Sequence, residues 1–307
     1  MKRLRFVSMA VIFLMMIFIS ACGGGQPAAT QPPAATEAPA ATEAPAEATS
    51  PEATAEFKDF DPGNFSRSTE IVNKWMPMKP GTQWAYEGTA VDEDGNKFAR
   101  RIEFTITDLT KEINGVRTVV AWIVDYNNDE IIEKEIAFYA QDNDGNVWYL
   151  GEHPEEIADG KFVDAPTWIA GVEDAKAGVK MMAEPKVGAA KYYQGWGPAV
   201  GWSDYAYIEK MGQETCVPVD CYKDVMVIAE ASLAEVGAAQ FKYYVSEVGE
   251  IRVNWGGQDA TQEALQLVEH TQLSPDALAE VRAEALALEK HAYEVSADVY
   301  GKTSPME

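Results

Sequence analysis

The sequence predicts a mainly β fold, an antiparallel meander curled into a barrel, half-barrel or sandwich, with one C-terminal amphipathic helix. Between residues 84 and 271, short segments of alternating apolar and polar residues are separated by turns rich in Asn, Asp and Gly. No long amphipathic helix pattern interrupts this series. Only the last forty residues or so carry apolar residues at helical spacing.

Five consecutive strands are expected in the first half of the series. Residues 98–109 place Ile102 and Phe104 on one face of a strand. The Asn114-Gly115 pair that follows favours a tight hairpin, because both residues tolerate positive φ. The other strands expected in this half cover residues 84–88, 116–126, 131–140 and 147–150.

The second half begins with an irregular stretch, residues 151–204, which is rich in Gly, Pro and aromatic residues. We expect loops there and no regular strand. Alternation then resumes and predicts five more strands, at residues 205–209, 225–229, 241–245, 250–255 and 264–271.

The terminal helix should begin after Ser274, a favourable N-cap residue, with Pro275 at the first helical position. Its apolar stripe is expected to lie against an open face of the sheet and comprises Leu278, Val281, Ala285, Leu288, Ala292 and Val295. Its charged residues are expected to form a solvated face, namely Glu280, Arg282, Glu284, Glu289 and Lys290.

Composition excludes several classes of protein. The 307 residues include 49 Asp and Glu against 25 Lys and Arg, a formal charge of -24. Binding to nucleic acid needs clustered Lys and Arg, so nucleic acid is not an expected partner. With 47% hydrophobic and 10% aromatic residues, the chain can build a sizeable core.

The N-terminus has the order of a secretory signal peptide, predicted at residues 1–21. A basic start is followed by an apolar run at residues 7–19, which is shorter than the ~20 residues of a permanent membrane span. The run leads into Ile19-Ser20-Ala21-Cys22-Gly23, a sequence similar to a bacterial lipobox. We therefore expect cleavage before Cys22, attachment of diacylglycerol to its sulfur, and an extracytoplasmic protein anchored in the cell envelope.

The segment after the lipidation site has a restricted composition of Ala, Pro, Thr, Glu, Gly, Gln and Ser. Without large apolar side chains it cannot offset the entropy lost on folding. Residues 22–56 are thus expected to form the lipidated, disordered stalk. The β-rich head follows at residues 57–273, and residues 274–307 contribute the C-terminal helix, packed on the head, and the tail.

Three stretches of the head resemble a family of uncharacterised secreted bacterial lipoproteins. They are Trp75-Met76-Pro77-Met78-Lys79-Pro80-Gly81-Thr82-Gln83-Trp84-Ala85-Tyr86, the Ala140-Gln141-Asp142-Asn143-Asp144-Gly145-Asn146-Val147-Trp148-Tyr149 hairpin and the tail at 283–301. Met78 stands where the family has Leu. The resemblance implies an exported lipoprotein with no assigned activity.

One loop combines aromatic side chains with Gly and Pro. Its candidate ligand-binding residues are Tyr192, Tyr193, Trp196, Trp202 and Tyr205. Aromatic rings on loops can stack on a ligand or line the opening of a pocket. The alternative is that the same rings fill the core of the head.

Cys216 and Cys221 are expected to form a disulfide. Once Cys22 is lipidated, two of the three cysteines remain, in an exported chain. The spacing is not Cys-x-x-Cys and the context is β, which argues against a redox role.

No catalytic residue, cofactor or metal site is predicted. His153, His270 and His291 are far apart in the sequence. The Asp-x-Asp-Gly-Asn segments at 92–96 and 142–146 lack the flanking acids of a calcium loop and are typical of hairpin turns.

These observations predict a non-enzymatic head that binds a small or hydrophobic ligand, or an envelope partner, on the concave side of its sheet. The membrane is the expected partner of the lipidated N-terminus. Two alternatives remain, a surface hydrolase that uses carboxylates and a purely structural envelope lipoprotein.

Overall fold

The computed structural model describes residues 54–307, so the predicted signal peptide, Cys22 and most of the predicted stalk lie outside the described residues. Within the described part of the chain, no helix has both the length and the hydropathy needed to cross a membrane.

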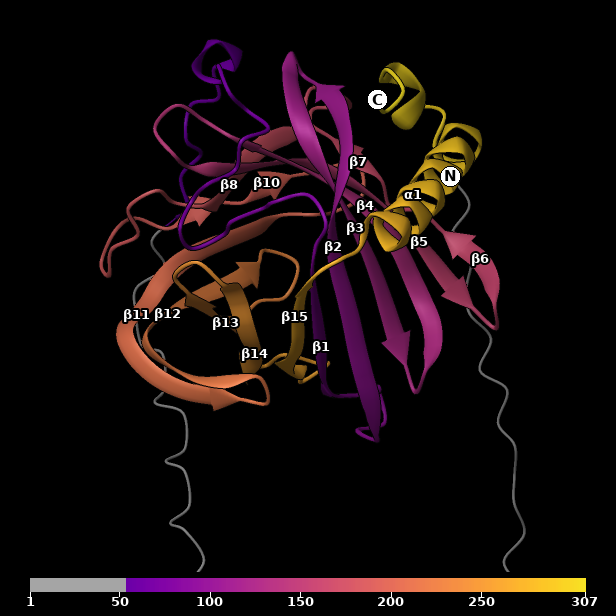
Figure 1. Ribbon diagram of the computed structural model, residues 1–307. Coiled ribbons are helices and arrows are strands. Elements are labelled where there is room, and N and C mark those ends of the chain that lie inside the picture. The colour runs from indigo at the N-terminus through magenta and orange to yellow at the C-terminus, as the bar shows by residue number, and fades with distance from the viewer. Residues whose placement is uncertain (1–53) are drawn as a thin grey trace, which may run out of the picture. The chain divides into compact units, whose positions relative to one another are not determined.

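The fold is mainly β, with a single curled antiparallel sheet and one α-helix at the C-terminal end, as the sequence predicts (Figure 1). The first eight strands are β1 (Thr82–Val91), β2 (Lys97–Ile113), β3 (Val116–Asn127), β4 (Glu130–Gln141), β5 (Val147–Ala158), β6 (Lys161–Asp164), β7 (Trp168–Ile169) and β8 (Lys176–Met181). The others are β9 (Tyr192–Tyr193), β10 (Gly195–Trp196), β11 (Asp204–Val217), β12 (Asp220–Ser232), β13 (Ala238–Val245), β14 (Gly249–Gly257) and β15 (Ala264–Gln272). The helix is α1 (Pro275–Val295), and two 3-10 turns are η1 (Pro62–Asn64) and η2 (Tyr300–Lys302).

The strand order runs β10-β8-β5-β4-β3-β2-β1-β15-β14-β13-β12-β11-β9, with β6 and β7 paired to β5. The two ends of this path, β10 and β9, are neighbours in the chain and are joined through Gln194. The sheet is therefore not closed by one continuous ladder. It curls until its two edges are connected by this short segment, which pairs with β11 on one side of Gln194 and with β8 on the other.

The turns form as their residue types predict. Asn114 and Gly115 have φ values of 50° and 80° and connect β2 to β3, which confirms the expected hairpin. At the β4–β5 turn, the Asp142 carboxylate accepts hydrogen bonds from the Asn146 backbone N–H and the Trp148 Nε1, each at 2.8 Å. This carboxylate thus stabilises the turn in which it lies.

The expectation of irregular structure at residues 151–204 is wrong in part. β5 continues to Ala158, and five short strands follow, of which β7, β9 and β10 have two residues each. A pair of residues is too short to show alternation, so periodicity could not reveal these strands.

Helix α1 begins as predicted, with the Ser274 hydroxyl accepting from the Ala277 N–H at 3.2 Å, and it packs against β2 and β4. Its buried apolar residues are Ala285, Leu288 and Ala292, whereas Val295 is 37% exposed. The predicted stripe therefore holds for the middle of the helix and fails at its C-terminal end.

Glu289 corrects the prediction of a solvated charged face. It is buried, and its Oε1 accepts from the Nζ of the fully buried Lys111 at 2.8 Å. The Tyr300 hydroxyl and the Met306 N–H also donate to Glu289, at 3.1 and 2.9 Å. The helix is thus attached to β2 by a buried ion pair and not by apolar contacts alone.

We predict that Glu289→Ala lowers the free energy of unfolding by about 3–5 kcal/mol, because it leaves the Lys111 charge buried without a partner. The control is Glu284→Ala on the same helix, whose carboxylate is 60% exposed and pairs with Lys134. It should cost at most ~1 kcal/mol. Urea denaturation of both variants measures the difference, and equal losses would contradict the assignment.

Candidate functional site

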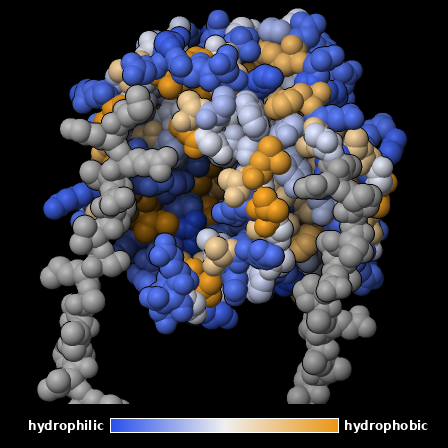
Figure 2. Space-filling view, turned by 180° about the vertical axis from the view of Figure 1, so that it is seen from behind, coloured by the Kyte–Doolittle hydropathy of each residue, from blue (hydrophilic) through white to orange (hydrophobic). Residues whose placement is uncertain are grey.

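A cavity of about 550 Å³ lies inside the curled sheet. Small-molecule sites in proteins usually measure roughly 300–1,000 Å³. The space-filling view shows a hollowed face with both hydrophilic and hydrophobic residues around the recess (Figure 2). Most of the lining side chains come from strands, and their aromatic members are Trp84, Tyr86, Phe104, Tyr139, Tyr149, Trp202 and Tyr244.

Strand register explains why charged residues also face this cavity. Directly paired residues of an antiparallel sheet lie on the same face. Phe104 pairs with Ile123, and Ile123 pairs with Glu135, so the three form one row across β2, β3 and β4. All three line the cavity. The neighbouring residue Ile136 has the opposite orientation and is fully buried on the other face.

The first group of charges in the cavity centres on Glu230 of β12. Its carboxylate accepts from Lys180 of β8 at 2.9 Å and from Lys242 of β13 at 3.0 Å. Gln194 Nε2 donates to the same carboxylate at 2.7 Å. Burial by itself would raise the pKa of Glu230, but the two ammonium groups outweigh it and lower the pKa to about 2. Glu230 is therefore ionised and well compensated.

A second group centres on Arg100 of β2. Its guanidinium donates to Glu263 at 2.8 Å and also to Asp125 of β3. The other oxygen of Asp125, Oδ1, is buried and has no hydrogen-bond partner within residues 54–307. Burial raises the pKa of Asp125 to about 6 even though Arg100 opposes the shift.

A third group is a pair of carboxyls, Glu135 of β4 and Glu152 of β5. The Tyr149 hydroxyl donates to both, at 3.3 Å to Glu135, and Trp168 Nε1 donates to Glu152 at 2.9 Å. Burial is the main cause that raises the pKa of each, and for Glu135 the Glu152 charge adds to it.

Asp204 of β11 faces the same cavity from the other side of the junction at Gln194. Within the described chain its side chain makes no hydrogen bond or ion pair. Burial, followed by the nearby Glu230 charge, raises the pKa of Asp204 to about 6. Asp204, Glu135 and Glu152 are thus three acids of the lining that form no ion pair within residues 54–307.

The structure places one of the predicted aromatic residues, Trp202, directly in the cavity lining. Its ring stacks on Trp168 with the centroids 4.7 Å apart and meets Tyr149 edge-on at 5.7 Å. Gly195 permits this arrangement, because a Cβ there would lie 2.7 Å from ring atoms of both tryptophans. Trp202, Tyr149 and Glu152 are therefore held in one rigid cluster.

The other candidate aromatics take different positions. Tyr192 pairs with Ala206, which pairs with Glu230, so Tyr192 lies on the inner face of the sheet. Its hydroxyl is buried without a partner in the described chain. Tyr193 stacks on Phe57 at 4.2 Å and meets Trp196 and Tyr205 edge-on. None of Tyr192, Tyr193, Trp196 and Tyr205 lines the cavity.

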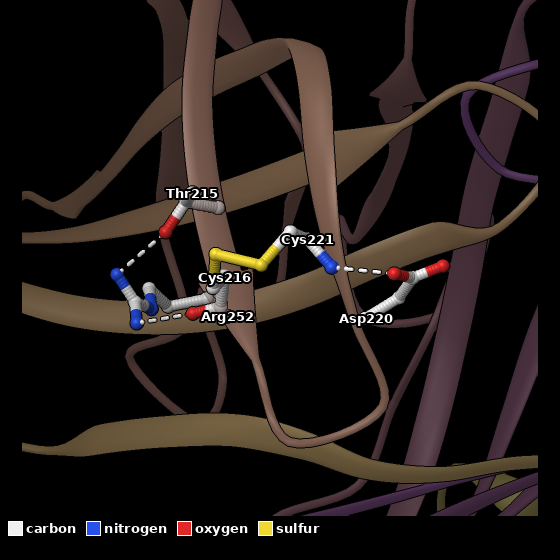
Figure 3. The surroundings of a disulfide bond; sticks show 5 residues. All are labelled: Thr215, Cys216, Asp220, Cys221 and Arg252. Atoms are coloured by element: carbon white, nitrogen blue, oxygen red, sulfur yellow. Dashed lines mark hydrogen bonds between the residues drawn. A yellow bond between two sulfur atoms is a disulfide. The ribbon is translucent and has the colours of Figure 1, made fainter.

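Cys216 and Cys221 are joined by a disulfide across the end of the β11–β12 hairpin (Figure 3). Beside it, Arg252 donates to the Thr215 hydroxyl at 2.8 Å and to the Cys216 carbonyl at 2.9 Å. None of these residues lines the cavity. The bridge ties the hairpin end and takes no part in the candidate site.

Two of the three histidines come together outside the cavity. His153 Nε2 and His291 Nδ1 lie 3.2 and 2.7 Å from Glu155 Oε1, which links β5 to α1. His270 stacks on Trp84 with the centroids 5.3 Å apart. No group of three or more His, Cys, Asp or Glu side chains among residues 54–307 is arranged to hold a metal ion.

Sequence reasoning missed the charged residues of the cavity. Glu135 in β4 and Lys242 in β13, both in the lining, occupy alternate positions that are typical of a solvated strand face. The signal available in the sequence was the number of charged residues in these strands. Several of them stand at the same alternate positions as large apolar residues, and therefore on the same face of the sheet. Alternation does not reveal which face of a curled sheet is the inner one.

Comparison with known proteins shows no family. The chain matches no protein-family model, and no curated protein is significantly similar to it. A predicted exported protein with a YmcC-like fold from Bacteroides fragilis has 10% identity and a TM-score of 0.39, with 65% of this chain and 99% of that chain covered. A predicted lipoprotein from Parabacteroides distasonis has 13% identity and a TM-score of 0.34, covering 64% and 97%.

A third solved structure is a β-barrel-like protein of a domain of unknown function from Brucella abortus. It has 10% identity and a TM-score of 0.32, with 63% of this chain and 98% of that chain covered. Likenesses at these TM-scores carry no conclusion about the function of this chain.

The carboxyls predict an unusual dependence of stability on pH. Asp125 and Asp204 have pKa values raised to about 6, and Glu133, beside Asp125, to about 8 because of burial. The usual pKa of a carboxyl is ~4. At pH values between ~4 and these raised pKa values, the folded state therefore binds more protons than the unfolded chain. The charges that face Asp204 are Glu152, Lys180, Glu230 and Lys242.

The free energy of unfolding should accordingly fall as the pH rises from 5 to 8, and the shifts of Asp125 and Asp204 alone correspond to about 2–3 kcal/mol. The low pKa of Glu230 has the opposite effect, but only below pH ~4.5, where its ion pairs are lost. Urea denaturation of residues 54–307 at pH 5 and 8 measures the change. A rise in stability between these two pH values would contradict the assignment.

Proposed function

We propose that this protein is a lipid-anchored extracytoplasmic binding protein that holds a small ligand inside its curled sheet. The observation that carries this proposal is the cavity of about 550 Å³, whose walls combine aromatic rings with charged side chains. Protein interiors are otherwise packed at the density of organic crystals, and an unfilled interior costs stability. A purely structural protein has no reason to keep both the space and the unpaired acids.

The arrangement of the acids favours binding over hydrolysis. Glycosidases separate their two carboxyls by about 5–9.5 Å so that substrate or water fits between them. Glu135 and Glu152 are instead bridged by the Tyr149 hydroxyl, which is hydrogen-bonded to both. This pair can accept hydrogen bonds from a ligand, but the phenol hydroxyl occupies the place that substrate or water takes between the carboxyls of a glycosidase.

The anchor rests on the sequence Ile19-Ser20-Ala21-Cys22, which lies outside the described residues. We predict that Cys22→Ser releases the protein from the membrane fraction and leaves the head folded, because the acylated sulfur is the attachment point. The Cys216→Ser/Cys221→Ser double variant is the control and should remain attached. Incorporation of labelled fatty acid into the Cys22→Ser protein would refute this prediction.

Native mass spectrometry of the head purified from its own host should detect a bound small molecule. We predict that Trp202→Ala lowers the retained fraction, because loss of one aromatic contact weakens binding by about 0.5–1.5 kcal/mol, roughly two- to tenfold. The control is Trp196→Ala in the same loop, which does not line the cavity and should leave the fraction unchanged. If both variants lower the retained fraction equally, the cavity is not the binding site. The absence of any added mass in the spectrum would also count against a ligand in the cavity.

A further inference from the structure

We infer that the ligand is a small organic cation, whose ammonium group is held by Glu135, Glu152 and Asp204 and whose body packs on Trp202 and Tyr149. This inference rests on the proposed function, since it specifies the chemistry of the ligand in the same cavity.

The cavity lining has an excess of negative charge, since it contains eight acidic side chains and two lysines. Glu230, Glu250 and Glu263 have cationic partners in Lys180, Lys242 and Arg100. Two further acids are accounted for without a ligand. Asp259 accepts from the Thr261 N–H of its own turn at 2.9 Å, and Glu235 is exposed to solvent.

Glu135, Glu152 and Asp204 remain, and none of them forms an ion pair within residues 54–307. Burying a charge without a partner is costly, and such groups take up protons unless a cation is supplied. A ligand with a positive charge would supply that partner. A monocation would compensate the charge of one of the three acids in the bound state.

Aromatic side chains lie beside the Glu135 and Glu152 carboxyls. Tyr149 donates to Glu135 and Glu152, while Trp168 donates to Glu152 and stacks on Trp202. Tyr149 in turn stacks on Tyr139 with the centroids 4.8 Å apart. Aromatic faces next to carboxylates are the usual surroundings of bound ammonium groups, because the ring quadrupole attracts a cation.

Tyr192 carries a buried polar group without a partner among residues 54–307. This residue is 4% exposed, and its hydroxyl has no hydrogen-bond partner in the described chain. It shares an inner-face row with Ala206 and with Glu230, and of these three residues only Glu230 lines the cavity.

Asp125 Oδ1 is a second buried oxygen without a partner, in a row with Ile102 of the lining. Buried polar atoms in folded proteins are almost always hydrogen-bonded. The Tyr192 hydroxyl and Asp125 Oδ1 are therefore unsatisfied polar groups on the inner face of the described sheet, and neither residue is part of the cavity lining. Among possible ligands, an ammonium group would donate to the three carboxyls that do line the cavity, whereas an anionic ligand would meet these uncompensated carboxyls and a purely apolar one would satisfy none of them.

The test is calorimetric titration of the head at pH 7.5 with 2-phenylethylamine and choline, and with two matched probes, neutral 2-phenylethanol and anionic 3-phenylpropanoate. We expect at least one amine to bind about tenfold or more tightly than the alcohol, and no binding of the anion. Asp204→Asn and Glu135→Gln should each weaken amine binding by about tenfold, the effect of ~1.4 kcal/mol. The control is Glu269→Gln, which removes an equal charge from an exposed position on β15. It should have no effect.

The outcomes separate this inference from the proposed function. Three results would overturn the inference that the ligand is a cation. They are equal affinity for the alcohol and the amine, binding of the anion alone, and amine binding that Asp204→Asn and Glu135→Gln do not weaken. A neutral or anionic molecule retained in native mass spectrometry would also overturn it, and would still support a binding cavity. If no probe binds and no molecule is retained, both the inference and the proposed function fail.

Discussion

The interior of this fold depends on the buried ion pairs of Glu230. Lys180 lies on β8, near one end of the strand path, and Glu230 lies on β12, near the other end. Strand pairing does not join these edges in a continuous ladder, so the carboxylate, its two lysines and Gln194 hold them together. Removal of one partner from such a group leaves a buried charge, which makes the arrangement strongly specified.

Once the edges meet, the positions of the remaining groups follow from register. The inner faces of β4 and β5 carry Glu135 and Glu152, and the opposite edge brings Asp204 and Trp202 to the same cavity. Acids in such a place reduce the stability of the empty head, because burial raises their pKa values. Proteins commonly keep destabilising groups where binding requires them, and we interpret the three acids in this way.

Short patterns in the sequence predicted the strands, the turn and the helix start, which depend mainly on residues that are close together in the chain. Alternation located the long strands, Asn114-Gly115 located a hairpin, and Ser274 with Pro275 marked the start of α1. The ion pair between Lys111 and Glu289 could not be foreseen, because 178 residues separate its partners and each looks like a surface charge. Trp202 was a candidate because its loop is rich in aromatic residues.

The acids of the cavity were not foreseen for a related reason. An inward carboxylate in a β-strand has the same sequence pattern as an outward one, and only the direction of curling distinguishes them. The ion pairs of the curled sheet join β8, β12 and β13, which come after β4 in the chain, so the sequence of β4 alone does not reveal which of its faces is the inner one.

If interior acids are kept at the expense of stability, the effect should be clear at Asp204, because its side chain has no hydrogen bond or ion pair in the described chain. The measurement is the free energy of unfolding of Asp204→Asn, determined by urea denaturation at pH 8 and at pH 4. We expect the variant to be about 1–3 kcal/mol more stable than the parent protein at pH 8, with little difference at pH 4, where the carboxyl is protonated. A variant that is less stable than the parent at pH 8 would show that the Asp204 carboxylate does not destabilise the fold.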